Sequence, residues 1–161
     1  MIKLVAKLLS TKPVFNYLLN RAIKTPYQHI YGAKDKELYM ERYWLFNPLN
    51  RDTKGLKHPW CPISIRIHKI VKPDSDRHLH DHPWNARTFI LKGWYFEERE
   101  NEKNILRYAG DTAKLNFNEY HRISRVSPEG AYTMFVTGKY RGTWGFLVEG
   151  VKLKYWEYLS S

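Results

Sequence analysis

The feature that most constrains this chain is a series of short, closely spaced segments of strand character that begins near residue 63. In the clearest one, residues 63–68, isoleucine alternates with a polar residue. Alternation with a period of two is typical of a strand that buries one face. Further strand candidates follow at 77–82, 86–92, 94–99, 105–108, 112–116, 120–126, 131–138, 143–149 and 152–158. Many short strands separated by turn residues predict an all-β sandwich or closed barrel.

The N-terminal part follows a different pattern. Residues 2–23 carry apolar side chains at helical spacing, and Pro13 lies between the two halves. Because proline is tolerated in the first turn of a helix, two short helices and one kinked helix both fit. We expect this segment to pack on the outside of the β structure. The length suits one domain over 1–161, with a helical extension at 1–38 and a β-barrel at 39–161.

The distribution of charge argues against a nucleic-acid site. The formal net charge is +11, which by itself would favour an anionic partner. However, residues 1–60 hold 11 basic and 4 acidic residues, whereas residues 61–161 hold 16 and 12. The basic excess therefore lies in the N-terminal third, without a basic block or an RNA-binding motif. We predict no specific nucleic-acid partner.

Membrane and compartment signals are weak. No apolar run approaches the roughly 18 residues of a membrane-spanning helix, so no membrane span is predicted. The single cysteine, Cys61, excludes an internal disulfide and favours a reducing compartment, hence a cytoplasmic location. The partners left open are a small-molecule ligand and a second copy of the chain in a homodimer.

The chemistry of the chain concentrates in a histidine-rich segment at residues 78–84. His78, His80 and His82 alternate there, and alternate side chains of a strand point to the same face. Two imidazoles at i and i+2 can therefore reach one ion. Imidazole suits divalent Fe, Zn, Ni or Mn, so the pattern predicts a metal site without fixing the metal.

The run from His80 to Gly93 resembles the first motif of the cupin superfamily, in which a His-x-His pair is followed by a glutamate, a strand and a glycine. The spacing from Gly110 to His121 resembles the second motif, although its proline, glycine and asparagine are replaced. The resemblance covers roughly residues 63–150 and implies a cupin (jelly-roll) β-barrel. The segments HLHDHPW, LKGWYFEE and GTWGF also resemble small uncharacterised cupins of bacteria and phages.

This resemblance implies a ligand set of His80, His82 and His121. The glutamate of the first motif falls on Ala86, which cannot bind a metal. A set of three histidines without a carboxylate is similar to that of the thiol dioxygenases in the same superfamily, and it leaves positions open for other ligands. In an alternative register His78 pairs with His80, so His78 is kept as a fourth candidate ligand.

Three further residues are candidates for holding a substrate. Trp84 follows the ligand segment directly and is placed to wall a pocket. Strict alternation puts Arg125 on the face of His121, where its guanidinium could bind a carboxylate or phosphate. One of the two glutamates after Gly93 should face inward, and Glu98 is the one we select. No residue is identified as catalytic.

Three functions fit these observations. The leading one is a metal-binding cupin enzyme, oxygenase-like, that uses three histidines and acts on a small polar substrate. The alternatives are a metal- or ligand-binding module without catalysis and a structural or interaction protein with a degenerate site. The lost glutamate and the altered second motif favour the alternatives. The fold alone does not decide between them.

Overall fold

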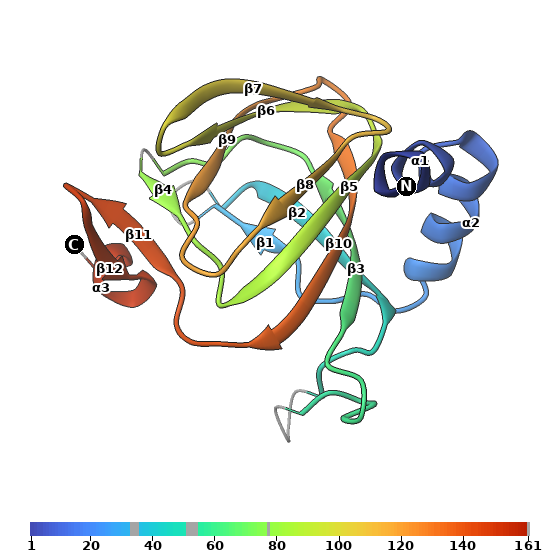
Figure 1. Ribbon diagram of the computed structural model, residues 1–161, viewed down its shortest axis with the longest axis horizontal. Helices are drawn as coiled ribbons and strands as arrows, with labels where there is room; N and C mark the ends of the chain where they lie inside the picture. Colours follow the sequence, from blue (N-terminus) through green and yellow to red (C-terminus); the bar gives the residue numbers. More distant parts are fainter. Residues whose placement is uncertain (33–35, 51–54, 77, 161) are drawn as a thin grey trace.

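A computed structural model describes residues 1–32, 36–50, 55–76 and 78–160 (Figure 1). Within these residues the strands form two antiparallel six-stranded sheets. The first sheet has the order β1-β2-β3-β10-β5-β8, and the second has the order β12-β11-β4-β9-β6-β7. Consecutive strands thus change sheets repeatedly, as in a jelly roll.

Most strand bounds lie within a few residues of the predicted segments, but the prediction of a strand at 152–158 is wrong after Lys154, because Tyr155–Leu159 form a helix. The first sheet contains β1 (Ile30–Tyr31), β2 (Leu38–Phe46), β3 (Ser64–Ile70), β5 (Trp84–Lys92), β8 (Thr112–Leu115) and β10 (Ala131–Tyr140). The second contains β4 (Leu79–His80), β6 (Trp94–Arg99), β7 (Glu102–Tyr108), β9 (His121–Val126), β11 (Gly145–Val148) and β12 (Val151–Lys154). Of the expected strand at 77–82 only two residues are β structure, and its first residue, Arg77, lies outside the described residues.

The all-β class is confirmed, but the prediction of a closed barrel is wrong. Among the described residues no strand pairing joins the two sheets, which face each other as separate layers. The core between the layers includes Ile90 and Ala131 from the first sheet and Tyr95 and Ile123 from the second. Side-chain packing, rather than backbone hydrogen bonding, therefore holds the two layers together.

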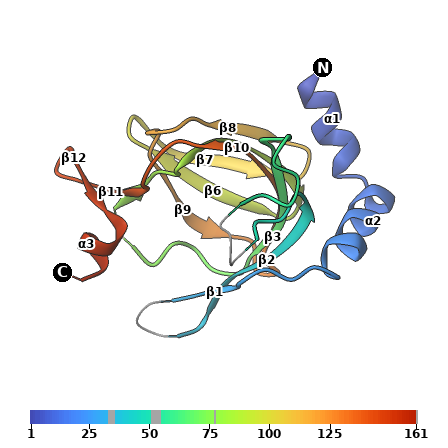
Figure 2. The same cartoon turned by 90° about the horizontal axis from the view of Figure 1, so that it is seen from below.

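The N-terminal segment forms two helices, α1 (Ile2–Leu9) and α2 (Lys12–Ala22), with Pro13 in the first turn of the second. Both lie outside the first sheet, on the side opposite the chain's C-terminal end (Figures 1 and 2). Ala6 and Phe15 pack with Ile67 and Leu91 of the sheet, so the expected packing on the outside is confirmed. No helix of the described residues is both long and apolar enough to cross a membrane.

The two helices bury the face of β3 that would otherwise be exposed. The sequence predicted a strand with one buried face, but both faces are buried. Ile67 lies under the helices, whereas Arg66 and His68 point to the opposite face and line a cavity. The apolar stripe therefore faces the helices, and the polar stripe faces the interior of the molecule.

The C-terminal segment completes the second sheet. After β12 the chain forms a short helix, α3 (Tyr155–Leu159), which lies beside β11 and β12 at the left of Figure 1. The link to β4 depends on Asp81, which is fully buried. Its carboxylate accepts a hydrogen bond from the backbone N–H of Gly145, at 2.7 Å, and an ion pair from Lys152. Asp81 thus anchors the histidine segment to β11.

Gly93, the glycine of the first motif, connects β5 and β6. Its φ is +77°, a region that side-chain-bearing residues rarely adopt. A Cβ at this position would lie 2.5 Å from the carbonyl oxygen of Gly130. The turn that separates the histidine segment from β6 therefore requires a glycine.

Candidate metal centre

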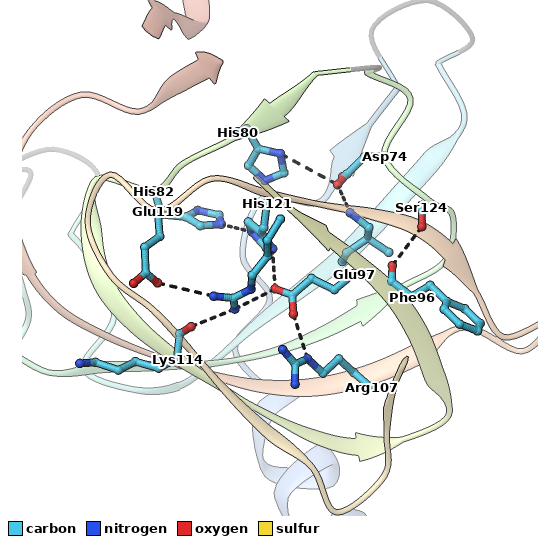
Figure 3. A network of polar contacts seen from close by, with 12 residues as sticks. Asp74, His80, His82, Phe96, Glu97, Arg107, Lys114, Glu119, His121 and Ser124 are labelled. Carbon is cyan, nitrogen blue, oxygen red and sulfur yellow. Dashed lines mark hydrogen bonds and ion pairs between the residues drawn. The ribbon is translucent and has the colours of Figure 1, made fainter. Parts of the chain in front are cut away.

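The fold brings His80, His82 and His121 together. Each offers one ring nitrogen, and the three nitrogens lie within 4.8 Å of one another. His80 ends β4 and pairs directly with His121 on β9, while His82 follows in the link to β5. Figure 3 shows the three side chains approaching one another from these elements. The third histidine arrives from a neighbouring strand, as the sequence predicted, but His82 lies beyond the end of β4 rather than on one strand with His80.

The separation of the ring nitrogens suits a shared ion. The Nε2 atoms of His82 and His121 are 3.0 Å apart. Two ligands at right angles around one ion, each about 2.1 Å from it, are also about 3.0 Å apart. Neutral imidazoles are good ligands for Fe, Zn, Ni and Mn. The donor set therefore fits a divalent first-row metal, and its identity is not fixed by the residues.

Burial keeps these histidines in the form that binds metals. Desolvation lowers the pKa of His80 to about 4, although Asp74 and Asp81 act in the opposite direction. Desolvation, with the neighbouring His121 and His80, also lowers the pKa of His82 well below its ordinary value. Both imidazoles are therefore neutral at neutral pH, and their lone pairs are available.

A buried glutamate on β6 stands behind His121. Glu97 is 1% exposed, and its Oε1 lies 3.1 Å from Nδ1 of His121. Arg99 donates to the same carboxylate at 3.0 Å. Arg107 also donates to it, at 2.8 Å (Figure 3). Burial alone would raise the pKa of Glu97, but the bond to His121 and the two guanidinium groups lower it to about 2. The ionised carboxylate holds a proton on Nδ1 and leaves Nε2 free to bind a metal.

The selection of Glu98 as the inward glutamate is therefore wrong. Glu98 points away from the site and forms an ion pair with Arg122 at 2.9 Å. Because side chains alternate along a strand, only one of the two consecutive glutamates can face inward, and in the structure it is Glu97. The sequence narrowed the choice to these two residues but could not settle the phase of the strand.

The centre lies in the wall of a cavity of about 490 Å³, which reaches the surface because exposed residues such as Tyr31 also line it. Trp84, selected from the sequence, lines this cavity as predicted. Aromatic rings surround the histidines: His82 lies 5.6 Å from Phe135 and His80 lies 6.4 Å from Trp144, measured between ring centres. The cavity is large enough for a small organic molecule next to the histidines.

Two other predicted site residues lie elsewhere. His78 is not a member of the histidine group, and its Nδ1 is 2.9 Å from the hydroxyl of Tyr158 on α3. Arg125 is exposed, with its guanidinium 4.0 Å from the ring centre of Phe96, so the prediction that it faces inward with His121 is wrong. The register between β6 and β9 shifts beside Phe96 and Glu97, and this irregularity breaks the alternation that the prediction assumed.

No family model matches this sequence, and no curated protein matches it significantly. Solved cupin structures share its fold. A cupin 2 conserved barrel domain protein from Rhodopseudomonas palustris has a TM-score of 0.55 at 13% identity, over 78% of this chain and 77% of that chain. A cupin-2 domain protein from Rhodospirillum rubrum has a TM-score of 0.51 at 13% identity, over 69% and 67%.

The structure of FeII HppE has a TM-score of 0.50 at 15% identity and covers 68% of this chain. This chain spans 55% of the HppE chain, little more than half its length. At these identities the likeness concerns the fold. The chain thus has the cupin fold that its two histidine motifs indicated, with a three-histidine cluster at its centre.

Proposed function

We propose that this protein is a metal-dependent cupin enzyme that binds a divalent first-row metal through His80, His82 and His121 and acts on a small molecule held in the adjoining cavity. The observation that carries the proposal is the convergence of three ring nitrogens within 4.8 Å in the wall of that cavity. The FeII of the similarly folded HppE supports iron as the first metal to test.

Different residues around the centre hold the different ligands in position. Glu97 fixes the tautomer and orientation of His121, and Asp81 fixes the backbone between His80 and His82. The aromatic rings of Phe135 and Trp144 keep the surroundings of the histidines apolar, which strengthens electrostatic interactions there. A metal held by three histidines supplies Lewis acidity and open positions for a substrate oxygen or dioxygen.

The test is metal analysis of the freshly purified protein and of matched histidine variants. We expect about one equivalent of metal per chain in the parent, because the three nitrogens form one site. His121→Ala should lose stoichiometric binding. His78→Ala is the matched control and should retain the metal, since His78 bonds to Tyr158 instead.

Two results would contradict this proposal. One is a parent protein that binds none of Fe, Zn, Ni or Mn stoichiometrically, even when each is added in excess. The other is a His121→Ala variant that binds metal as tightly as the parent. Loss of metal in His78→Ala with retention in His82→Ala would instead support the alternative register of the ligand segment, in which His78 takes the place of His82.

A further inference from the structure

A second polar group lines the cavity opposite the histidine cluster, on the first sheet. Arg66 and His68 lie at i and i+2 on β3, and Trp84 begins β5. Arg66 is 6% exposed and His68 is 8% exposed. All three residues line the cavity that adjoins the metal ligands.

Each of these three side chains has a buried nitrogen that no protein group satisfies. These atoms are Nε of Arg66, Nε2 of His68 and Nε1 of Trp84. Buried polar groups in native proteins are nearly always hydrogen-bonded, and an unsatisfied one costs stability. Because the three side chains line one cavity, a hydrogen-bonding ligand bound in that cavity is the partner that could satisfy them.

The charge of Arg66 specifies the kind of ligand. No carboxylate among the described residues forms an ion pair with it; instead, its guanidinium carbon lies 5.3, 5.0 and 5.5 Å from the ring centres of Trp44, Trp84 and Phe135. Ring faces attract a cation but do not accept its in-plane N–H bonds in the way that a carboxylate does. Burial and the nearby Arg42 lower the pKa of Arg66 to about 10, so it remains charged at neutral pH.

Arg66, His68 and the metal ligand His82 share one neighbour, Phe135. Phe135 is a neighbour of both groups: its ring centre is 5.5 Å from the Arg66 guanidinium and 5.6 Å from the centre of the His82 ring. His68 also contacts this ring, at 5.2 Å. A molecule of a few carbon atoms can therefore reach both sides of the cavity at once.

We infer that the substrate of this centre is a small carboxylic acid, whose carboxylate binds Arg66 and the N–H of Trp84 while the rest of the molecule extends toward His80, His82 and His121. This inference deepens the proposed function, since it names the substrate class for the same cavity. The planar guanidinium matches a planar carboxylate, and Trp84 adds a donor that has no other use. An uncharged ligand would leave the buried cation without a counterion.

The experiment compares benzoate with benzamide, which has the same shape but no charge. NMR titrations into the millimolar range follow the side-chain N–H signals of Arg66 and Trp84, the latter assigned by its loss in Trp84→Phe. Benzoate should shift both signals saturably, and benzamide should not. Arg66→Met should weaken benzoate binding about 10- to 100-fold, because hydrogen bonds to charged groups are among the strongest.

Matched variants keep the result interpretable. Arg125→Met removes an exposed guanidinium that also lies against an aromatic ring, and it should leave benzoate binding unchanged. Arg66→Lys keeps the charge without the planar fork and should give intermediate affinity, which covers the case in which Arg66→Met does not fold. Equal shifts by benzamide, no shift by benzoate, or parent-like affinity in both Arg66 variants would overturn the inference.

The titration is repeated in His121→Ala to separate the two proposals. Arg66 lies on the first sheet, so benzoate should still shift its signal when the metal ligand is gone. The His121→Ala variant would then have lost its metal but kept the carboxylate site. Conversely, a protein that binds metal stoichiometrically but does not respond to benzoate would refute the substrate class alone.

Discussion

The two walls of the cavity differ in how their polar groups are satisfied. On the second sheet, His121 is backed by Glu97, and the loop that carries His82 is anchored through Asp81. On the first sheet, Arg66, His68 and Trp84 each keep a buried nitrogen without a protein partner. The second sheet has such an atom in Arg99, which is not part of the cavity lining. A wall whose side chains are already fixed can present a constant set of lone pairs. A wall with unsatisfied donors can instead discriminate between ligands, because only some of them complete its hydrogen bonds.

Removal of the charge behind His121 should have the largest effect. Glu97→Gln leaves Arg99 and Arg107 facing a neutral amide in a buried position, and the bond to His121 loses its ionic character. We expect a loss of about 3 kcal/mol in the free energy of unfolding and about 10- to 100-fold weaker metal binding. Urea unfolding and competition with a metal chelator measure the two quantities.

Glu98→Gln is the control for this change, since the adjacent residue pairs with Arg122 nearer the surface. It should cost less than about 1 kcal/mol and leave metal affinity unchanged. If both variants weaken metal binding equally, the second wall is not the preorganised one, and the contrast between the walls fails.

Acid should destabilise the metal-free protein through the histidine wall. Unfolded His80 takes up a proton below its ordinary pKa of 6.5, whereas folded His80, with a pKa of about 4, stays neutral. The unfolded state therefore binds more protons, and stability falls as the pH drops from about 6.5 toward 4. At about pH 5 this amounts to about 2 kcal/mol for His80 alone.

Urea unfolding with a chelator present, at about pH 7.5 and about pH 5, measures this loss. Glu97 does not contribute in that window, because its lowered pKa acts only below about pH 4.5. His80→Asn should flatten the dependence. The slope that remains comes from His82 and His68, because burial also lowers the pKa of each of these histidines. Equal stability of the parent at both pH values would contradict the prediction.

The smallest effect is expected at the anchor of the histidine segment. In Asp81→Asn the side-chain oxygen can still accept from Gly145, but the amide no longer neutralises Lys152. We expect a loss of about 1–2 kcal/mol in the free energy of unfolding and a change in metal affinity smaller than that of Glu97→Gln. An affinity loss as large as that of Glu97→Gln would show that the backbone anchor, rather than the carboxylate behind His121, positions the ligands.

The sequence predicted the histidine wall better than the opposite wall. His80 and His82 are two residues apart, and their spacing to Gly93 and from Gly110 to His121 fixes the strands that carry them. For His80 and His121 these are local regularities that a strand translates directly into side-chain direction, whereas His82 lies in the link after β4. Ala86, where the cupin motif has a glutamate, is indeed a buried apolar residue that packs with Phe135.

The opposite wall was missed because a helix layer reversed the expected orientation of β3. Alternation alone identifies two faces but not which one points inward, and here Ile67 faces α1 and α2 while Arg66 faces the cavity. The wrong predictions for Arg125 and Glu98 have the same origin, since alternation does not identify the inward face of β6 or β9. A one-residue shift in register between β6 and β9 moves the side chain of Arg125 to the other face, and no sequence pattern predicts this shift.

The pairing of β4 has a consequence for how the protein opens. This strand is two residues long, and its only partner on β9 is the residue opposite His80, which is His121 itself. A strand this short holds its neighbours weakly and separates from them at little cost. An ion shared by the two histidines would act as a cross-link at that single point of contact. Slow hydrogen exchange in β4 and β11 would then indicate that the centre is occupied. The lifetime of the bound ion would be set by how often β4 separates from β9.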